Sequence, residues 1–336
     1  MARTFIIAEA GVNHNGSLDV ALRLIDAAKA SGADAVKFQT FRADQLATRS
    51  AHKAAYQERT TAREESQFEM LERLELDAVA HERLIDYCRQ VEIQFLSSPF
   101  DIQSADLLAT MKVPIFKVPS GEITNLPFLQ HIAKKGQPVI LSTGMSTLGE
   151  VEEAVNVLVA AGAPQLTLLH CVTEYPAPYA EVNLRAMQTL KIAFGLPIGY
   201  SDHTPGIDIA IAAVALGAEV IEKHFTLDRS LPGPDHAASL EPAELRQMVD
   251  GIRHVEAALG NGIKVPAPCE IPNISVARKS VVAARSLPKG HQLATGDLEI
   301  KRPGNGLAPK LLPSLLGRTL TADVAKDQVI QWNHLA

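Results

Sequence analysis

Eight short apolar runs alternate with amphipathic segments over most of the chain, and this alternation restricts the fold more than any other feature. Most of the runs are continuously apolar, as expected of parallel strands that helices cover. Strands that alternate with helices predict βαβ units with right-handed crossovers. Eight such units favour an α/β fold of the (β/α)8 barrel type over an open sheet, and the absence of G-x-G-x-x-G after the first run disfavours a dinucleotide-binding fold. The runs start at Phe5, Ala35, Gln94, Ile115, Pro138, Leu166, Pro197 and Val220.

The segments between the runs carry signals for the start and end of helices. Ser17 precedes a segment whose apolar residues follow helical spacing, so it is a candidate N-cap. Thr147 begins the pattern of a capping box. For a later helix, Asn183 is a candidate N-cap and Gly195 a candidate C-terminal stop.

Two stretches stand apart from this regular pattern. The polar, irregular segment 42–61 is longer than a usual loop after a strand, so it is either a lid or binding element or a solvated insertion. From Val265, ten residues contain three prolines, which predicts an extended linker. Short strand-like pieces between Gly and Pro turns then predict a small β-rich domain. We therefore expect a catalytic barrel over 1–264, a linker over 265–277 and a small domain over 278–336.

Charge, cysteine content and hydropathy limit the class of protein. The formal net charge of −6 comes from interspersed charges of both signs, which argues against a nucleic-acid binder but allows a few lysines to bind a small anion. Cys88, Cys171 and Cys269 form no zinc spacing or disulfide framework. We find no signal peptide and no apolar stretch near the ~18–20 residues of a membrane span. A soluble, cytoplasmic protein without membrane or nucleic-acid partners is the expectation.

Polar residues gather where the predicted strands end. Catalytic groups of (β/α)8 enzymes lie at this end of the strands. Each residue alone is explained more simply by solvation or turn formation, but their recurrence at one end of nearly every strand indicates a site. They are Glu9, Lys37, Gln39, Ser97, Ser98, Lys117, Ser120, Glu122, Ser142, Thr143, Tyr175, Ser201, Asp202, His203, Glu222, Lys223 and His224.

Two subsets of these residues suggest definite chemistry. His203 and His224 follow neighbouring strands, so their imidazoles could meet at one Mn²⁺, Co²⁺, Fe²⁺ or Zn²⁺ ion, although hydrogen-bonded core histidines are the competing interpretation. The second subset has two ammonium groups and two hydroxyls, which suit a phosphate or carboxylate. A doubly anionic small molecule is therefore the expected ligand. This subset is Lys37, Lys117, Ser120 and Ser142.

Nine ordered motifs make the chain resemble the sialic acid synthases, bacterial enzymes that make N-acetylneuraminate and its relatives legionaminate and pseudaminate. The C-terminal runs RKSVVAAR and KRPGNGLAP look like the antifreeze-like (SAF) domain of this family. The resemblance covers essentially the whole chain. The nine motifs are IIAEAGVNHNG, VKFQTF, FLSSPFD, FKVPSGEITNLPFL, PVILSTGM, HCVTEYPAP, GYSDHTPG, EKHFTLD and PGPDHAASLEP.

The resemblance implies condensation of phosphoenolpyruvate with an N-acetylated mannose-type sugar and water, giving a nine-carbon 2-keto acid and phosphate. His203 and His224 match metal ligands, usually for Mn²⁺, with Mg²⁺ or Co²⁺ as alternatives. Glu9 matches an acidic residue near the reacting carbons, and either it or Glu122 would orient the attacking water. Positions that hold phosphoenolpyruvate are matched by Lys37, Lys117, Ser120, Ser142 and Ser201. Positions near the sugar are matched by Gln39, Glu122, Tyr175 and Asp235.

The family is also a homodimer in which the small domain crosses to the partner's barrel. Arg302 matches an arginine that reaches the partner's sugar site. As a hypothesis for the reaction, phosphate leaves by cleavage of the C–O bond rather than the P–O bond.

Several alternatives remain open at this point. Some neuraminate synthases carry Asn where this chain has Thr173, so the sugar is either N-acetylmannosamine or 2,4-diacetamido-2,4,6-trideoxymannose. The chain could instead be another metal-dependent barrel aldolase or epimerase, or a Schiff-base aldolase that uses Lys117 or Lys223. A carbohydrate- or ice-binding protein that uses its C-terminal domain is the alternative from a different class.

Overall fold

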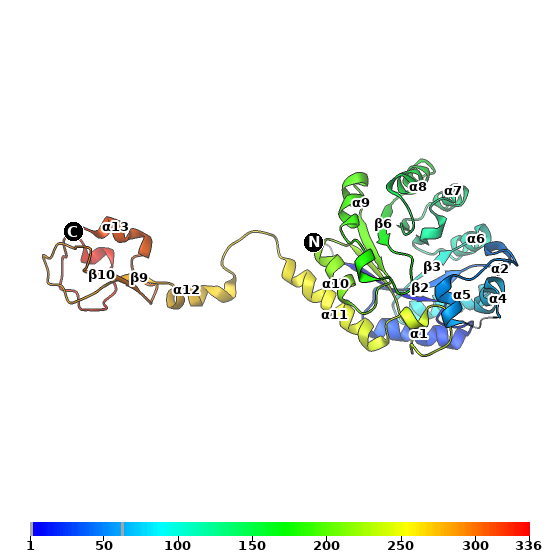
Figure 1. Cartoon of the computed structure of the whole chain (residues 1–336), viewed down its shortest axis with the longest axis horizontal. Helices are drawn as coiled ribbons and strands as arrows, with labels where there is room; N and C mark the ends of the chain where they lie inside the picture. The colour runs from blue at the N-terminus through cyan, green and yellow to red at the C-terminus, as the bar shows by residue number, and fades with distance from the viewer. Residues whose placement is uncertain (1–2, 62–63) are drawn as a thin grey trace. The chain divides into compact units, whose positions relative to one another are not determined.

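The chain divides into two compact units, Met1–Gly260 and Asn261–Ala336. A computed structural model describes residues 3–61 and 64–336 (Figure 1). The first unit contains an eight-stranded sheet with its helices, and the second contains a small two-stranded sheet.

The first unit is a (β/α)8 barrel, which confirms the predicted fold. Hydrogen bonds connect the strands in the order β3-β2-β1-β8-β7-β6-β5-β4, and all seven neighbouring pairs are parallel. The two end strands of this order, β3 and β4, also pack against each other, which closes the barrel. The strands are β1 Phe5–Gly11, β2 Ala35–Thr40, β3 Gln94–Pro99, β4 Phe116–Val118, β5 Val139–Ser142, β6 Leu166–Cys171, β7 Ile198–Asp202 and β8 Val220–His224.

Helices surround the strands (Figure 1). Because a helix leaves its first backbone N–H groups unpaired, capping side chains fix where it begins. The main helices of the unit are α1 Leu18–Ala30, α5 Ala78–Gln90, α6 Ile102–Thr110, α7 Leu126–Ala133, α8 Leu148–Ala160, α9 Ala186–Phe194, α10 Asp208–Ala215 and α11 Pro242–Leu259.

Three of the four predicted helix signals are confirmed. The Ser17 side chain accepts from the backbone N–H of Val20, Thr147 forms the capping box of α8, and Gly195 ends α9 at a positive φ of 64°. The N-cap prediction at Asn183 is wrong, because α9 begins only at Ala186. Asn183 has a φ of 48°, and its carbonyl accepts from the Ala186 N–H in the turn before the helix.

Alternation along the strands puts an apolar layer beneath a polar one inside the barrel. Successive strand residues point to opposite faces, so residues two apart share a face. An interior apolar cluster takes one residue from each of six strands, and it contains Ile7, Ala35, Leu96, Ile140, Leu169 and Val220. Two residues further along β1, β2, β5, β6 and β8 stand Glu9, Lys37, Ser142, Cys171 and Glu222. The apolar cluster therefore fills the interior below the strand ends, and the polar side chains lie above it.

The segment expected to be irregular, 42–61, contains two short helices, α2 Ala43–Leu46 and α3 Ala55–Thr60. A third helix, α4 Gln67–Leu74, follows. Met70 and Leu74 of α4 form an apolar cluster with Val12 and Phe41, against which Leu46 also packs. The segment is therefore irregular only outside α2 and α3, and Leu46 of α2 packs on a small core that supports a helix too short to be stable alone.

The second unit contains β9 Ser280–Ala283 antiparallel to β10 Leu298–Lys301, with α12 Ile271–Ala277 and α13 Leu312–Leu315. Its own apolar cluster includes Val281, Leu293 and Ile330. We had expected the proline-rich segment to be extended, and this prediction is wrong for part of it. It forms a 3-10 turn at Pro268–Glu270 and then α12, because a proline in the first turn of a helix needs no N–H donor.

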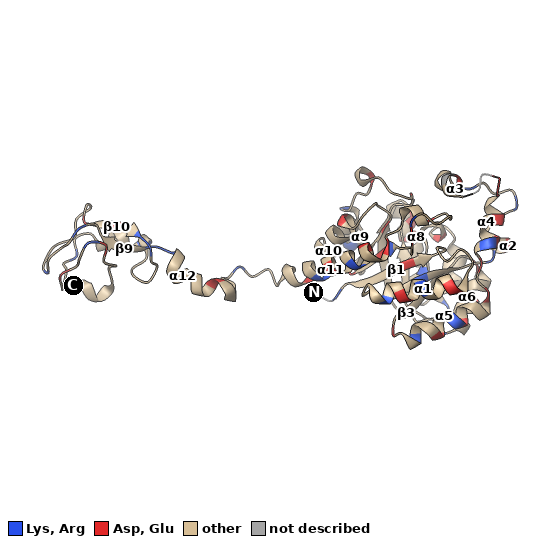
Figure 2. Cartoon of the chain, turned by 90° about the horizontal axis from the view of Figure 1, so that it is seen from below, with Lys and Arg blue, Asp and Glu red and all other residues tan. Residues whose placement is uncertain are grey.

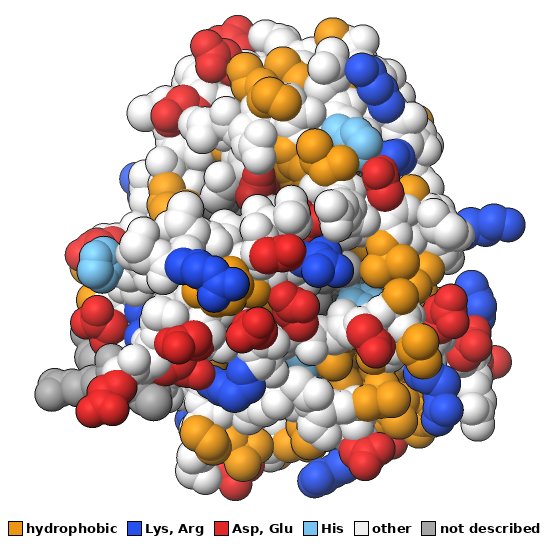
Figure 3. All heavy atoms as spheres, turned by 90° about the vertical axis from the view of Figure 1, so that its right-hand side faces the viewer, with side chains coloured by type: hydrophobic (Ala, Val, Ile, Leu, Met, Phe, Trp, Pro, Cys, Tyr) orange, Lys and Arg blue, Asp and Glu red, His pale blue; other side chains and the backbone are white. Residues whose placement is uncertain are grey.

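The surface carries charges of both signs. Figure 2 shows lysines, arginines and acidic residues spread over the helices, and the face that Figure 3 presents has acidic and basic side chains side by side. Within residues 3–61 and 64–336, no helix has both the length and the hydropathy needed to cross a bilayer.

Gly199 of β7 gives a test of the packing inside the barrel. A Cβ at this position would overlap the backbone oxygen of Val220 and the side chain of Leu169, so we expect Gly199→Ala to cost about 1–3 kcal/mol. Gly149→Ala is the matched control, since nothing lies within 4 Å of its added Cβ and alanine favours a helix. Thermal unfolding should show a lower melting temperature for the barrel in Gly199→Ala alone. Equal melting temperatures in both variants would contradict the close approach.

Candidate active site

A cavity of about 230 Å³ lies at the C-terminal ends of the barrel strands. The structure brings most of the predicted site residues together in its wall, and these come from seven of the eight strands or the loops that follow them. They are Glu9, Lys37, Gln39, Lys117, Ser120, Ser142, Tyr175, Ser201, His203 and His224.

Four buried charged groups form the floor of this cavity. The Lys37 ammonium lies 2.7 Å from Glu9 and 3.7 Å from Glu222, and it donates to the Ser98 hydroxyl at 2.9 Å. Lys117 lies 3.2 Å from Glu222. Lys37, Lys117, Glu9 and Glu222 are each at most 4% exposed. Burial of a charge is costly unless it is paired, so these ammonium and carboxylate groups depend on one another.

The two carboxyls of this group have opposite shifts in pKa. Burial is the largest influence on Glu9, and although Lys37 opposes it, the pKa of Glu9 rises to about 7. Burial acts in the same direction on Glu222, but Lys117 and Lys37 together overcome it and lower the pKa of Glu222 to about 2. Glu222 is therefore a fixed anion between the two lysines, whereas Glu9 can hold or release a proton near neutral pH.

His203 and His224 face each other beside these charges. Their ring centroids are 5.4 Å apart, and the ring of Tyr175 lies 4.1 Å from that of His203. His203 donates from Nδ1 to the backbone oxygen of Val172 at 2.7 Å, which leaves its Nε2 with a free lone pair. The buried Nδ1 of His224 makes no hydrogen bond and lies 3.9 Å from a carboxylate oxygen of Asp235.

This pair of imidazoles fits a divalent cation. The ring centroids lie 5.4 Å apart, and the Nε2 lone pair of His203 and the unpaired Nδ1 of His224 are the nitrogens available to a metal. Among the described residues, no group of three or more His, Cys, Asp or Glu side chains is arranged to hold a metal. The protein side chains would therefore supply two nitrogen ligands, and oxygen atoms of substrate and water would complete the coordination.

Two hydroxyls of the cavity wall lack partners. The side-chain oxygens of Ser142 and Thr173 are buried without a hydrogen bond. Buried polar groups normally have a partner, so unpaired hydroxyls beside two lysines indicate a place for ligand oxygens. Ser120 is already engaged, since its hydroxyl accepts from the backbone N–H of Gly144 at 2.8 Å.

Three other predicted residues are not part of this cavity wall. Glu122 is half-buried in the 3-10 turn Ser120–Glu122 and accepts from the Asn125 amide at 2.7 Å. Asp235 lies in the wall of a neighbouring cavity, together with Gln39 and Tyr175. Arg302 is an exposed residue of the C-terminal unit and donates to the backbone oxygen of Ala277 at 3.1 Å.

Lys223 does not reach the cavity. Its ammonium is fully buried 2.7 Å from Asp202, which is also fully buried, and neither residue lines the cavity. Asp202 follows the inward-pointing Ser201, and Lys223 follows the inward-pointing Glu222, by one position. Lys223 and Asp202 therefore pair on the other face of their strands. This placement removes Lys223 as a Schiff-base lysine but leaves Lys117, whose pKa burial lowers despite Glu222.

The role of Glu222 was missed by the sequence analysis, which placed it at a strand end and gave it no function. The alternation of side-chain directions along a strand could have predicted that Glu222 points into the site. Glu222 lies two positions before His224, so both side chains point to the same side of β8. The Ser201 hydroxyl, from the same face of β7, donates to Glu222 at 2.9 Å.

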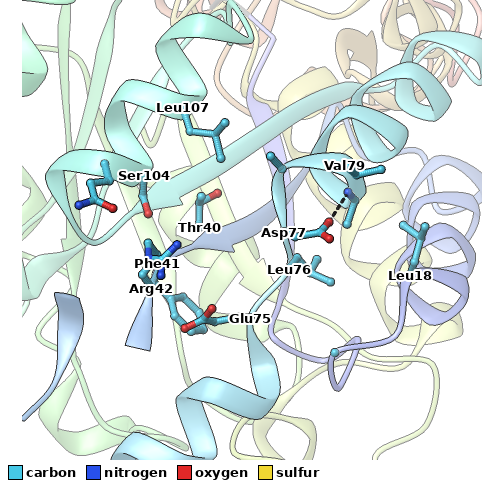
Figure 4. Close-up of a pocket in the computed structure, with 14 residues that line it drawn as sticks. Leu18, Thr40, Phe41, Arg42, Glu75, Leu76, Asp77, Val79, Ser104 and Leu107 are labelled. Atoms are coloured by element: carbon cyan, nitrogen blue, oxygen red, sulfur yellow. Dashed lines mark hydrogen bonds between the residues drawn. The ribbon is translucent and has the colours of Figure 1, made fainter. Parts of the chain in front are cut away.

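A larger cavity of about 680 Å³ lies at the start of α5, next to residues that follow β2 (Figure 4). Its two carboxylates are already in use: Asp77 caps α5 by accepting from the Ala80 N–H at 2.7 Å, and Glu75 accepts from the Ala43 N–H. None of the buried polar atoms found unpaired in the described residues belongs to its wall. The strand-end cavity is therefore the better candidate for a binding site.

The fold is that of the (β/α)8 barrel enzymes, and the cavity at the strand ends is its candidate active site. The sequence matches the model of the NeuB family over residues 24–264 and that of the SAF domain over residues 278–336. The chain belongs to the NeuB family, which confirms the resemblance to sialic acid synthases and the presence of the antifreeze-like domain.

Similar proteins cover nearly the whole chain. An N,N'-diacetyllegionaminic acid synthase of Campylobacter jejuni is 54% identical, with 98% of this chain and 100% of that protein aligned. An enzyme of the same name from Legionella pneumophila is 48% identical over 98% of this chain and 94% of its own length. A crystal structure of the N-acetylneuraminic acid synthetase from Leptospira borgpetersenii in complex with citrate has a TM-score of 0.71 and 38% identity, covering 81% of this chain and 90% of that one.

Replacement of Glu222 tests the buried charge cluster. Glu222→Gln removes the anion shared by Lys37 and Lys117, and loss of one partner from a buried ion pair costs about 3–5 kcal/mol. We expect a lower melting temperature than in the wild type, and a larger rise on addition of inorganic phosphate, since bound anion would replace the lost charge.

The control for this experiment is Glu219→Gln, which removes a half-exposed carboxylate 3.6 Å from Lys191. An exposed pair of this kind contributes about 0–1 kcal/mol, so the melting temperature should hardly change. A Glu222→Gln variant as stable as the wild type, with an unchanged response to phosphate, would contradict the proposed cluster.

Proposed function

We propose that this chain is a nonulosonic acid synthase that condenses phosphoenolpyruvate with an N-acetylmannosamine-type sugar and water. The products are N-acetylneuraminate or N,N'-diacetyllegionaminate, and phosphate. Family membership supports the class of synthase, and one observation carries the substrate assignment. Two buried lysines share a cavity with two facing histidines, so a small anion and an electrophile can lie side by side.

Phosphoenolpyruvate carries a phosphate and a carboxylate, and the cavity has partners for both. Lys37 and Lys117 would bind them with ammonium groups, and the Ser120, Ser142 and Ser201 hydroxyls lie in the same wall. Because Glu9 and Glu222 already hold the two lysines in place, their side chains are positioned before the ligand arrives. Such preorganisation lowers the entropic cost of bringing the two substrates together.

His203 and His224 are the proposed ligands of a divalent cation, with Mn²⁺ the first candidate and Mg²⁺ or Co²⁺ the alternatives. When bound there, the cation would supply Lewis-acid activation of the sugar aldehyde. The Val172 carbonyl orients the His203 ring through Nδ1.

The proposed reaction forms a bond between the methylene carbon of phosphoenolpyruvate and the aldehyde carbon of the open-chain sugar. The aldehyde oxygen becomes a hydroxyl, and a water oxygen adds to carbon 2 of the former phosphoenolpyruvate. Cleavage of the bond between carbon 2 and its phosphate oxygen then gives the ketone and inorganic phosphate. Glu9 is the best placed of the carboxyls to carry the proton, since it is buried beside Lys37 with a pKa of about 7. Glu122 is a second candidate, near the sugar.

The C-terminal domain has a role in the same proposal. We propose a homodimer in which this domain closes the partner's barrel and Arg302 binds the sugar there. In support, the Arg302 side chain is exposed in its own unit and forms no ion pair among the described residues. A cytoplasmic location is also proposed, because all three cysteines are unpaired.

Phosphate release should require both phosphoenolpyruvate and an N-acetylmannosamine-type sugar in the presence of Mn²⁺. His203→Ala and His224→Ala should each reduce kcat at least 100-fold, because each removes one of the two nitrogen ligands. His131→Ala is the control, since that half-buried histidine pairs with Asp106 outside the cavity. The readout is a coupled phosphate assay together with measurement of bound metal.

Metal-dependent turnover by both histidine variants would show that the ligand assignment is wrong. Label in the bridging oxygen of phosphoenolpyruvate should leave with phosphate, whereas label retained in the keto acid would contradict C–O cleavage. Borohydride trapping of pyruvate on Lys117, without any need for phosphoenolpyruvate, would favour the Schiff-base aldolase instead.

Mixed dimers test the proposed role of Arg302. Subunits with Arg302→Ala and subunits inactivated by Lys117→Ala should each be inactive alone, and mixing them should restore up to about a quarter of wild-type activity. Restoration is expected because one site of the hybrid would pair an intact barrel with an intact Arg302. Mixing each variant with itself is the control, and no gain in the mixture would show that Arg302 does not act on a partner.

A further inference from the structure

We propose that the buried ion pair of Asp202 and Lys223 positions the two histidines that would hold the metal. Each member of the pair directly precedes one of these histidines, His203 or His224. The pair fixes the distance between the two imidazoles and thereby sets the affinity of the site for a divalent cation. This inference rests on the proposed function, and it assigns a role to two buried charges that the proposed reaction does not use.

The pair joins the ends of two neighbouring strands. Asp202 is the last residue of β7 and lies opposite Lys223 in the parallel register of β7 and β8, with its Oδ2 atom 2.7 Å from the ammonium group. Both side chains are fully buried on the outer face of the strands, and α10 packs against both strands. The two strands are therefore linked one residue before the point where each histidine projects into the cavity.

Thr204 connects the pair to the far side of His203. The backbone N–H and the hydroxyl of Thr204 donate to Oδ1 of Asp202 at 2.9 and 2.8 Å, and its backbone oxygen accepts from the Lys223 ammonium. Three polar groups of one buried residue are thus bonded to the two members of the pair. Because His203 stands between Asp202 and Thr204, its backbone is held from both ends.

Each histidine also has contacts of its own. The Val172 carbonyl accepts from Nδ1 of His203, and the His203 carbonyl accepts from the Ala177 N–H at 2.9 Å. The carbonyl of His224 accepts from the Leu240 N–H at 2.9 Å. These bonds tie each histidine to a different loop, so they orient each residue without setting the distance from one to the other.

A second side-chain link between the two strands lies on their inner face. There the Ser201 hydroxyl donates to Glu222, and both residues belong to the cavity wall. A ligand in the cavity would compete for these groups. Asp202 and Lys223 do not line the cavity, so their link does not depend on whether a ligand is bound.

Stability alone is a poor explanation for the pair. Burial removes both charges from water, and replacement of a buried ion pair by apolar residues of similar volume is often neutral or even stabilising. Apolar side chains would, however, lack the directed bonds that hold the two strands and Thr204 in one arrangement. Loss of hydrogen bonds that orient metal ligands commonly lowers metal affinity about 10–100-fold.

Metal binding by a doubly apolar variant is the test. Asp202→Leu/Lys223→Met removes both charges together, so we expect a folded protein with a melting temperature close to that of the wild type. Its affinity for Mn²⁺, measured without substrates from the EPR signal of free Mn²⁺, should be at least tenfold lower than that of the wild type. Its affinity for phosphoenolpyruvate should stay within about threefold, because Lys37 and Lys117 keep their partners.

A second double variant separates the directed bonds from the charges. Asp202→Asn/Lys223→Gln is also uncharged but keeps polar groups that can bond to Thr204, so its Mn²⁺ affinity should lie within about threefold of the wild type. Affinity as low as in the apolar variant would contradict the proposed role of these bonds.

Asp34→Leu/Arg253→Met is the matched control. This largely buried pair, 2.9 Å apart, connects the residue before β2 to α11 and lies far along the strands from the histidines. Its removal should leave the Mn²⁺ affinity unchanged. A fall as large as in the Asp202→Leu/Lys223→Met variant would show that loss of any buried pair of the barrel weakens the site.

The proposed function and this inference fail in different ways. If the wild type binds no Mn²⁺, or if His203→Ala and His224→Ala bind it as the wild type does, the metal assignment itself is wrong. If the histidine variants lose Mn²⁺ while Asp202→Leu/Lys223→Met binds it normally, only the role of the pair is wrong. An equal fall in the affinities for Mn²⁺ and phosphoenolpyruvate would show that the pair merely supports the fold.

Should the doubly apolar variant fail to fold, Thr204→Val decides. This substitution keeps the shape of the side chain and removes only the hydroxyl bond to Asp202. It should weaken Mn²⁺ binding at least threefold, and an unchanged affinity would overturn the inference.

Discussion

The buried ion cluster of Lys37, Lys117, Glu9 and Glu222 is the interaction on which the rest of the site depends. Each member would be too costly to bury alone, so the cluster forms as a unit or not at all. The pKa of Glu222 is lower than that of Glu9 because both lysines act on Glu222. Glu222 is therefore the permanent counter-ion of the two lysines. Two cations are thereby held in the interior of a protein whose net charge is −6.

The apolar layer beneath the cluster holds the strands that position its charged side chains. Apolar residues such as Ile7 and Val220 fill the interior, and residues two positions later on the same strands carry the charges. Parallel strands bring these charges to one end, where the histidines on β8 and after β7 also lie. The inserted helices α2–α4 then contribute to the wall of a second, mainly apolar cavity next to the charged one.

The strands and the general position of the site could be predicted from the sequence because both depend on local patterns. Apolar runs identified all eight strands, and strand ends identified the wall of the cavity. The directions of the side chains were harder to predict. Lys223 and Asp202 were predicted as site residues, yet they pair on the opposite face of their strands. Helix α3 was missed because its six residues are too few for a propensity signal, and Tyr56 contacts Tyr175 far away in the sequence. Glu122 lies outside the cavity wall, since the turn after β4 directs it to Asn125.

Binding of phosphoenolpyruvate is the most direct test of the claim that the lysine cluster is the anion site. Isothermal titration calorimetry on the metal-free wild type should show a single binding site per barrel. Lys117→Met should weaken binding at least 100-fold, because it removes a buried cation from the cavity, while Lys191→Met on the surface should bind as the wild type does. Unchanged affinity in a folded Lys117→Met variant would contradict the assignment of this cavity to phosphoenolpyruvate.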